Sequence, residues 1–196
     1  MRTPPLSRVL CCVLVVLVAA PLLVPVPAAQ AESCGSYAPG GHPLARRAVT
    51  HACRQLGIRY AWGGGHGSRP GPTRGQCDAA AGAPEDCHHT GLDCSGLVRY
   101  GYHLATGRDP LGAGSSRDQW RTARVVDRFS AFEGTDPLLP GDLVYYGASP
   151  ERIRHVALYL GNGYVVEAPF PGGRVRVAEI SYREGYFGAL RLYRAA

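Results

Sequence analysis

The C-terminal part of the chain places the strongest limit on its fold. After residue 140 the sequence runs through five short β-rich segments separated by Gly, Asn and Pro turn residues: DLVYYG, RHVALYLG, GYVVEA, RVRVAEI and YFGALRLY. Short runs rich in β-branched and aromatic residues, with tight turns between them, are typical of antiparallel strands. The pattern therefore predicts an antiparallel sheet of five to six strands.

Two helical segments come before these strands. Residues 44–56 carry apolar side chains at helical spacing, residues 94–106 form a second helix-like segment, and each segment ends at a glycine. Asp93 precedes the second segment, where an aspartate can cap the first turn. Residues 107–140 are expected to be irregular, with a short helix near residues 117–122. Helices followed by antiparallel strands predict an α+β domain with the helices packed on the sheet.

The N-terminus has the features of a secretory signal. Arg2 and Arg8 precede an almost wholly apolar run at residues 9–24, and the small residues of AQA end at Ala31. We expect cleavage after Ala31, which makes the mature chain a secreted protein of the extracellular space or cell wall. A membrane anchor is the alternative, but Pro21 breaks the apolar run and Pro25 follows its end. We therefore expect no stable membrane insertion after cleavage.

Cleavage at this point would leave a single domain with a short lead. Residues 32–43 form the lead, and residues 44–196 are long enough for one domain with its own core. Residues 66–92 are rich in Gly, Pro and Cys and are expected to be a loop insertion. The formal net charge of +6 suits an anionic partner such as a cell wall, but it is also ordinary for a protein in solution.

The cysteine count of the mature chain is odd. Removal of the signal leaves five cysteines in an oxidising environment, where thiols that lie close together usually pair. Cys77 and Cys87 flank a loop that cannot build its own core, so we expect a disulfide between them. Cys34 is then expected to pair with Cys53 on the first helix. These two bridges leave Cys94 unpaired.

A metal site is the alternative for the loop cysteines. Cys77 and Cys87 are accompanied by His88 and His89, and zinc is held by such side chains. The nine residues between the two cysteines far exceed the spacing of zinc-binding pairs. No metal is therefore expected.

Cys94 opens the second helical segment, a position that suits a nucleophile. The positive end of the helix dipole favours a thiolate over a thiol. Free backbone N–H groups at the same end can hold an oxyanion. A cysteine nucleophile also needs a histidine as base and a third polar group that orients this histidine.

Among the seven histidines, only His155 lies on an expected core strand. In RHVALYLG, His155 shares one face with Ala157 and Tyr159, while the residues between them face the other side. The small Ala157 leaves room beside His155 for a partner. A hydrogen-bonded structural histidine is the alternative on this observation alone.

Glu167 on the next strand is the candidate third residue. If GNG at residues 161–163 forms a three-residue loop, Leu160 pairs with Tyr164, and Glu167 falls on the face of His155 and within its reach. A two-residue loop would turn Glu167 to the opposite face. An acid inside the apolar run YVVEAPF needs a partner to offset its burial, and an imidazolium would serve. Together with the cysteine at the helix start, the pair makes a candidate Cys–His–acid triad.

Four motifs, in order, resemble those of the NlpC family of secreted bacterial cell-wall peptidases: RYAWGG, GLDCSGLVRYGY, LLPGDLVYY and RHVALYLGNGYVVEAP. The resemblance covers residues 44–193 and implies a papain-like fold. It implies that Cys94 is the nucleophile and His155 the base. The third member in that family is often a second histidine, and Glu167 stands at its position as a variant also present in the family.

The resemblance extends to the surroundings of the nucleophile. It places Tyr60 in the active site, near the oxyanion or a substrate amine, and it associates Asp93 and Ser95 with substrate binding. Each of the latter two also has a simpler interpretation, Asp93 as a helix cap and Ser95 as a first-turn residue. Trp62 is expected to pack rather than to bind, and Gln119 has no expected role.

The resemblance implies a cysteine endopeptidase that hydrolyses peptidoglycan stem peptides at the γ-D-glutamyl–diamino acid bond, which is a D,L-endopeptidase. It implies no metal and no organic cofactor. We expect a monomer without a nucleic-acid partner, and a loop at residues 66–92 that shapes the rim of the cleft. Two alternatives stay open: a papain-like amidase or acyltransferase that acts on another wall bond, and a non-catalytic secreted protein that binds the wall.

Overall fold

A computed structural model describes Met1, Cys34 and residues 38–121 and 124–195. Apart from Met1, the expected signal at residues 1–31 lies outside the described residues. The described chain is an α+β domain, as the sequence predicts. Its central sheet has six strands in the order β3-β8-β4-β5-β6-β7, and a separate two-stranded ribbon joins β1 and β2.

The elements follow one another along the chain in a simple order. The helices are α1 (Pro43–Cys53), α2 (Cys94–Thr106) and α3 (Ser116–Trp120). The strands are β1 (Thr73–Arg74), β2 (Thr90–Gly91), β3 (Asp127–Ser130), β4 (Leu143–Gly147), β5 (Ile153–Gly161), β6 (Tyr164–Glu167), β7 (Arg176–Glu179) and β8 (Tyr186–Arg191). Short 3₁₀ turns are η1 (Asp86–His88), η2 (Ala131–Glu133), η3 (Pro150–Arg152) and η4 (Ile180–Tyr182).

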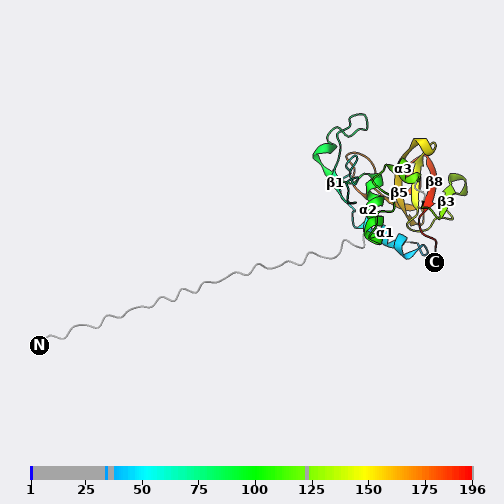
Figure 1. Cartoon of the computed structure of the whole chain (residues 1–196), viewed down its shortest axis with the longest axis horizontal. Coiled ribbons are helices and arrows are strands. Elements are labelled where there is room, and N and C mark those ends of the chain that lie inside the picture. Colours follow the sequence, from blue (N-terminus) through cyan, green and yellow to red (C-terminus); the bar gives the residue numbers. More distant parts are fainter. Residues whose placement is uncertain (2–33, 35–37, 122–123, 196) are drawn as a thin grey trace.

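The two long helices form where the sequence predicts them. His42 caps α1 by accepting a hydrogen bond from the backbone of Leu44, and the helix ends at Cys53, before the expected residue 56. Asp93 caps α2, and Gly107 ends it in the left-handed conformation, at a φ of 68°. Figure 1 shows α1 and α2 side by side, with β1 on the opposite side of α2 from β8.

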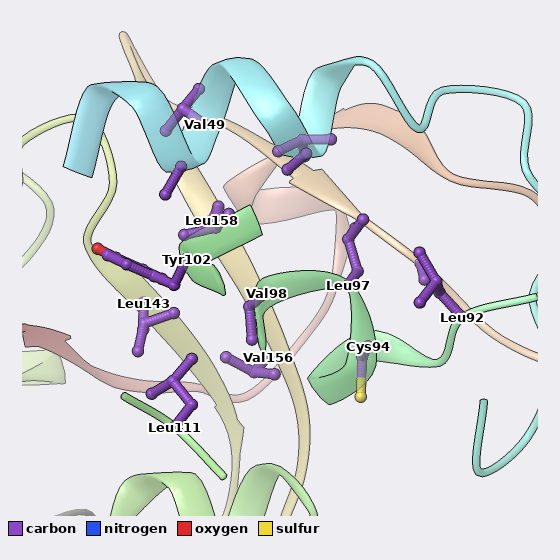
Figure 2. Packing of buried hydrophobic residues seen from close by; sticks show 14 of the residues in the cluster. Val49, Leu92, Cys94, Leu97, Val98, Tyr102, Leu111, Leu143, Val156 and Leu158 are labelled. Atoms are coloured by element: carbon purple, nitrogen blue, oxygen red, sulfur yellow. The ribbon is translucent and has the colours of Figure 1, made fainter. Parts of the chain in front are cut away.

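The sheet has two apolar faces because alternate strand residues point in opposite directions. One face packs against α1 and α2, and Figure 2 shows Val49, Val98 and Leu158 together in this cluster. The second face carries Ala157 and Tyr159 and is covered by residues outside the two long helices, including Leu138 and Ile180. The two faces of β5 are therefore divided as the sequence predicts.

The turn between β5 and β6 is shorter than predicted, but Glu167 still lies on the predicted face of the sheet. Asn162 and Gly163 have φ angles of 54° and 80°, which suit a two-residue type I′ turn, and Gly161 pairs with Tyr164. The expected pairing of Leu160 with Tyr164 is therefore wrong. A register shift at Leu160 absorbs one residue, as a β-bulge does. Beyond it the register is the one that a three-residue loop would have given, so Glu167 still lies on the face of His155.

The region at residues 107–140 contains more structure than the sequence indicates. It holds α3, close to the expected short helix, and the unexpected strand β3, which pairs antiparallel with β8. Most of β3 is exposed, and a four-residue edge strand without apolar alternation carries little signal. The loop at residues 66–92 likewise contains the β1–β2 ribbon.

Two disulfides join the cysteines that the sequence pairs. Cys34 is bonded to Cys53 across a Cα–Cα distance of 5.7 Å, and Cys77 to Cys87 across 4.7 Å. Of the cysteines that the structure describes, Cys94 alone is free. Within residues 38–121 and 124–195, no helix is both long and apolar enough to cross a bilayer.

Candidate active site

Cys94 is the first residue of α2, and the turn around it depends on two glycines. Asp93 accepts a hydrogen bond from the backbone N–H of Gly96 at 2.7 Å and donates its own N–H to the carbonyl of Gly64 at 3.0 Å. A Cβ at Gly96 would collide with that Gly64 carbonyl. The glycines of WGGG and DCSG are therefore needed at these positions because the two backbones touch.

The segment that carries Tyr60 is hydrogen-bonded to the residues just before Cys94. The backbone of Ala61 donates to the carbonyl of Leu92 at 3.2 Å, and Leu92 donates to Arg59 at 3.3 Å. These bonds hold the Tyr60 segment alongside the residues that lead into Cys94. Burial, with the nearby Cys94 and Asp93, raises the pKa of Tyr60. Its phenol therefore stays protonated and able to donate a hydrogen bond.

The Cys94 thiol lies at the edge of the apolar core. Figure 2 shows its sulfur directed away from the labelled apolar side chains, and the backbone N–H groups of Val156 and Ser95 interact with it. The Val156 contact brings the thiol beside β5 at the residue that follows His155. The nucleophile therefore lies against the strand that carries its candidate base.

Burial raises the pKa of the Cys94 thiol to about 12, and the charge of Asp93 acts in the same direction. The backbone N–H groups of Val156 and Ser95 oppose this shift but do not reverse it. The helix start thus acts toward the thiolate, as expected, but burial outweighs it, and the resting group is a thiol. A thiol of this kind needs a base that removes its proton as it attacks.

His155 and Glu167 form a buried pair on neighbouring strands. The Nε2 atom of His155 lies 2.7 Å from Oε2 of Glu167, and the two residues are 2% and 0% exposed. Burial lowers the pKa of His155 below its ordinary value of 6.5 despite the hydrogen bond to Glu167. A neutral ring that donates Nε2–H to Glu167 keeps a lone pair on Nδ1. That nitrogen can accept a proton.

Two arginines and a tyrosine cover the other side of the Glu167 carboxylate. Arg176 donates from Nε to Oε1 of Glu167 at 3.1 Å, and Arg183 lies 3.9 Å from Oε2. The guanidinium groups of both arginines lie over the ring of Tyr182, 4.6 and 5.5 Å from its centre. Burial acts to raise the pKa of Glu167, but the hydrogen bond to His155 and the charge of Arg183 hold it below its ordinary value. Glu167 is thus held as a carboxylate.

A second histidine–carboxylate pair involves Asp93, the residue before Cys94. Nε2 of His66 is 2.9 Å from Oδ2 of Asp93, and Nδ1 is 2.7 Å from the carbonyl oxygen of Ala113. Ser95 also donates to Asp93 at 2.9 Å. The hydrogen bond to Asp93 raises the pKa of His66 above 6.5. Both ring nitrogens face acceptors, which is the pattern of an imidazolium.

His66 lies at the start of the expected loop at residues 66–92, and the sequence predicts no role for it. Neither strand nor helix periodicity applies to a residue in this glycine-rich turn. Its only signal in the sequence is its position after WGGG, the segment that packs on the start of α2. The simpler interpretations of Asp93 and Ser95 describe what these residues do here, since both take part in the turn at the helix start.

A cleft of about 150 Å³ opens at the nucleophile. Trp62 lines it and is 36% exposed, so part of its ring faces the cleft, and the expectation that it packs rather than binds stays a prediction. Among the described residues, none from the loop at residues 66–92 lines the cleft, and this loop reaches the site through His66 instead. The residues that line the cleft are Tyr60, Trp62, Asp93, Cys94, Ser95, Ser115, Ser116, Arg117, Ile153 and Arg154.

Two further polar groups near the site have structural explanations. Gln119 on α3 is fully buried and donates to the carbonyl of Ser95 at 2.9 Å, which ties α3 to the start of α2. Cys77, Cys87 and His88 bring three metal-ligand atoms within 4.8 Å of one another. The two sulfurs are bonded to each other, so neither is a thiolate that could bind a metal.

Comparison with known proteins finds similarity over most of the chain. A family model described as the NlpC/P60 family matches residues 57–191. The chain is 38% identical over 160 residues to the peptidoglycan endopeptidase RipB of Mycobacterium tuberculosis. The match covers 79% of this chain and 58% of RipB, so the chain spans just over half the length of this relative.

Two solved structures extend the comparison to the fold. The P60 domain of antigen MAP1204 from M. avium subspecies paratuberculosis has a TM-score of 0.59 at 30% identity, covering 77% of this chain and 96% of that one. RipD from M. tuberculosis has a TM-score of 0.57 at 27% identity, covering 78% and 100%. RipD is described as a non-catalytic domain of this type, adapted to peptidoglycan binding.

Proposed function

Because the chain belongs to the NlpC/P60 family, we propose that it is a secreted cysteine endopeptidase that hydrolyses amide bonds in peptidoglycan stem peptides. One observation carries the proposal: the buried His155–Glu167 pair lies on β5 and β6 beside a free cysteine at the start of α2. The relative RipB, a peptidoglycan endopeptidase, supports the substrate class. The catalytic domain extends over residues 44–196.

In the proposed mechanism, Cys94 and His155 exchange the proton of the thiol. Nδ1 of His155 accepts this proton while the sulfur attacks the carbonyl carbon of the scissile amide. The backbone N–H of Cys94 and the phenol of Tyr60 hold the oxyanion. The imidazolium then protonates the leaving amine, and an acyl-enzyme remains on the sulfur.

Water completes the cycle on the same residues. His155, neutral again, takes a proton from a water molecule, and the resulting hydroxide attacks the thioester. The tetrahedral intermediate collapses, the thiol is regenerated, and the acid product leaves. Glu167 stabilises the imidazolium in both halves and fixes the ring with Nδ1 toward the nucleophile. Arg176 and Arg183 keep Glu167 ionised.

The finer assignments are part of the same proposal. The bond cut is the γ-D-glutamyl–diamino acid bond, and the enzyme acts in the cell wall as a monomer after cleavage of the signal at Ala31. Asp93 and Ser95 border the bound peptide, since both line the cleft. An amidase or acyltransferase acting on another wall bond would use the same three side chains, and only product analysis separates these activities.

One observation favours a second candidate function, peptidoglycan binding without catalysis. The pKa of Cys94 is raised to about 12, and RipD shows that this fold can be adapted to binding. Binding without catalysis does not explain why Glu167 is hydrogen-bonded to His155 beside the free thiol. It predicts a thiol that does not react with electrophiles at neutral pH.

The test is incubation of the purified protein with defined stem peptides, followed by mass spectrometry of the products. The wild type should release fragments cut between D-glutamate and the diamino acid, and Cys94→Ala should release none. Equal turnover by the two proteins would contradict the proposal. Iodoacetamide labelling provides the second arm: a label at Cys34 or Cys87 with Cys94 protected would contradict the assignment of the nucleophile.

A further inference from the structure

Two arginines line the cleft beside Cys94 without an ion-pair partner among the described residues. Arg117 on α3 and Arg154 on β5 both line it, and both side chains are exposed. Among the described residues, neither forms an ion pair or a side-chain hydrogen bond. The two cations therefore keep their full hydrogen-bonding capacity for a molecule that enters the cleft.

The acids near these arginines are already engaged. Asp93 is the acidic residue among those lining the cleft, and its carboxylate accepts from His66, from the hydroxyl of Ser95 and from the backbone of Gly96. Asp118, the neighbour of Arg117, accepts from both the backbone and the hydroxyl of Ser115. Asp118 keeps its negative charge and acts on Arg117, but it does not line the cleft. Among the lining residues, the two arginines outnumber the one acid, Asp93, so the lining carries an excess of positive charge.

Both arginines extend from backbone that is fixed relative to the nucleophile. Gln119 ties α3 to the carbonyl of Ser95, the residue after Cys94. Arg154 lies between Ile153, which pairs with Gly147 on β4, and His155, which pairs with Tyr146. The two guanidinium groups are therefore supplied from two elements that both border the reacting sulfur.

A guanidinium group recognises a carboxylate by two parallel charge-assisted hydrogen bonds and offers much less to a neutral amide, which lacks the charge. A free ammonium group would meet repulsion from both arginines and a carboxylate already paired with His66. The charges of the cleft thus favour an acidic ligand over a basic or neutral one.

We infer that Arg117 and Arg154 form a subsite for a free carboxylate of the substrate next to the scissile bond. The inference rests on the proposed function and adds a substrate class to it: stem peptides whose carboxyl groups near the cut are ionised, rather than converted to primary amides. The two arginines select the substrate, and they do not take part in bond breaking.

The experiment compares synthetic stem peptides of one sequence that carry either a free carboxylate or a primary amide at each position flanking the cut. For the wild type, kcat/KM should be higher for one free-acid peptide than for its amide by roughly tenfold or more. In the double variant Arg117→Gln/Arg154→Gln, the ratio of kcat/KM for the acid peptide to kcat/KM for the amide peptide should fall to near one. The fall should come from lower activity on the acid peptide, with little change on the amide. Arg47→Gln removes the same charge from an exposed position on α1 and should keep the wild-type preference.

Two results would overturn the inference: a wild type that does not distinguish acid from amide, or a double variant that keeps the wild-type ratio. The inactive Cys94→Ala protein separates this question from the proposed function, because its affinity for the same peptides is measured by calorimetry without turnover. Tighter binding of the acid peptide, lost on adding the two Gln substitutions, supports the subsite even if the wild type cuts none of the peptides. Equal binding of acid and amide contradicts it.

Discussion

Two histidine–carboxylate pairs lie near Cys94. The His155–Glu167 pair leaves one ring nitrogen free, whereas the His66–Asp93 pair leaves none. In the sheet, Glu167 engages Nε2 of His155 at 2.7 Å, and Nδ1 keeps its lone pair. In the loop, His66 uses Nε2 for Asp93 and Nδ1 for the carbonyl of Ala113, at 2.9 and 2.7 Å. The two pairs have similar lengths, but only the pair in the sheet retains a proton acceptor.

The surroundings reinforce this difference. His155 is fully enclosed, so burial lowers its pKa, whereas the side chain of His66 is 20% exposed and its hydrogen bond to Asp93 raises its pKa. The lowered pKa favours the neutral form of the first histidine, which can act as a base, while the raised pKa favours the cationic form of the second. A short distance between a histidine and an acid is therefore insufficient to identify a general base, and the occupancy of both ring nitrogens decides.

The largest expected difference between the pairs is in catalysis. His155→Ala should lower kcat/KM on a stem peptide by about 10³-fold or more, because the thiol loses its base. His66→Ala should lower it by less than about tenfold, because His66 exchanges no proton in the mechanism. Peptide hydrolysis followed by chromatography measures both. Comparable losses in two folded variants would show that the loop pair also takes part in the chemistry.

Substitution of the two carboxylates should affect different quantities: the rate for Glu167 and the pKa of Cys94 for Asp93. Glu167→Gln should cost about 10²-fold in kcat/KM, since the imidazolium loses its counter-charge and the ring its orientation. Asp93→Asn keeps a side chain that caps helices well and removes a charge that raises the pKa of Cys94. We expect a lower Cys94 pKa in this variant, measured from the pH dependence of thiol alkylation. An unchanged or higher pKa would contradict the stated effect of Asp93.

The histidine titrations should fall on opposite sides of pH 6.5. Catalysis needs neutral His155, and burial lowers its pKa from the ordinary 6.5, so the acid limb of kcat/KM should lie below pH 6.5. The pKa of His66 is raised from the same value, so its ring signals in NMR should titrate above pH 6.5. Glu167→Gln should move the acid limb further down, because Glu167 acts to raise the pKa of His155. An acid limb above pH 6.5 in the wild type would reverse the assignment.

The smallest expected effect is on stability. His66→Ala removes charged hydrogen bonds to Asp93 and Ala113 and should lower the free energy of unfolding by about 1–2 kcal/mol. Because the folded-state pKa of His66 is raised, the stabilisation by this pair is complete below pH 6.5 and declines as the pH rises through that raised pKa. Urea unfolding at pH 5.5 and pH 9 measures the change. A larger stability loss in the alkaline sample would contradict an imidazolium at this position.

The predictions that succeeded rest on local patterns. Helix α2 and the division of β5 into two faces follow from side-chain periodicity and end residues, whereas Glu167 keeps its predicted face through the register shift at Leu160 rather than through the predicted turn. The two disulfides follow from cysteine positions and loop composition. In each case the relevant information lies within a short stretch of sequence.

The features that the sequence does not predict depend on how distant segments meet. The helix dipole at Cys94 is a local property, but the burial that raises its pKa comes from residues packed around it. His66 and Arg183 lie outside the helices and strands, in segments without periodic patterns, so no segment of sequence indicated their contacts. Arg176 lies in an expected strand, but its position opposite Glu167 depends on which strands pair.

The register shift at Leu160 has a consequence for the tolerance of this hairpin to insertions and deletions. Val165 and Val166 are adjacent and both are fully buried, so β6 presents an apolar residue to either face of the sheet. Gain or loss of one residue in the turn would therefore preserve much of the core while carrying Glu167 away from His155. Such a length variant should fold and keep its surface, yet leave His155 without the carboxylate that orients it. A single codon in this turn is thus enough to weaken the proposed hydrolase while its surface stays unchanged.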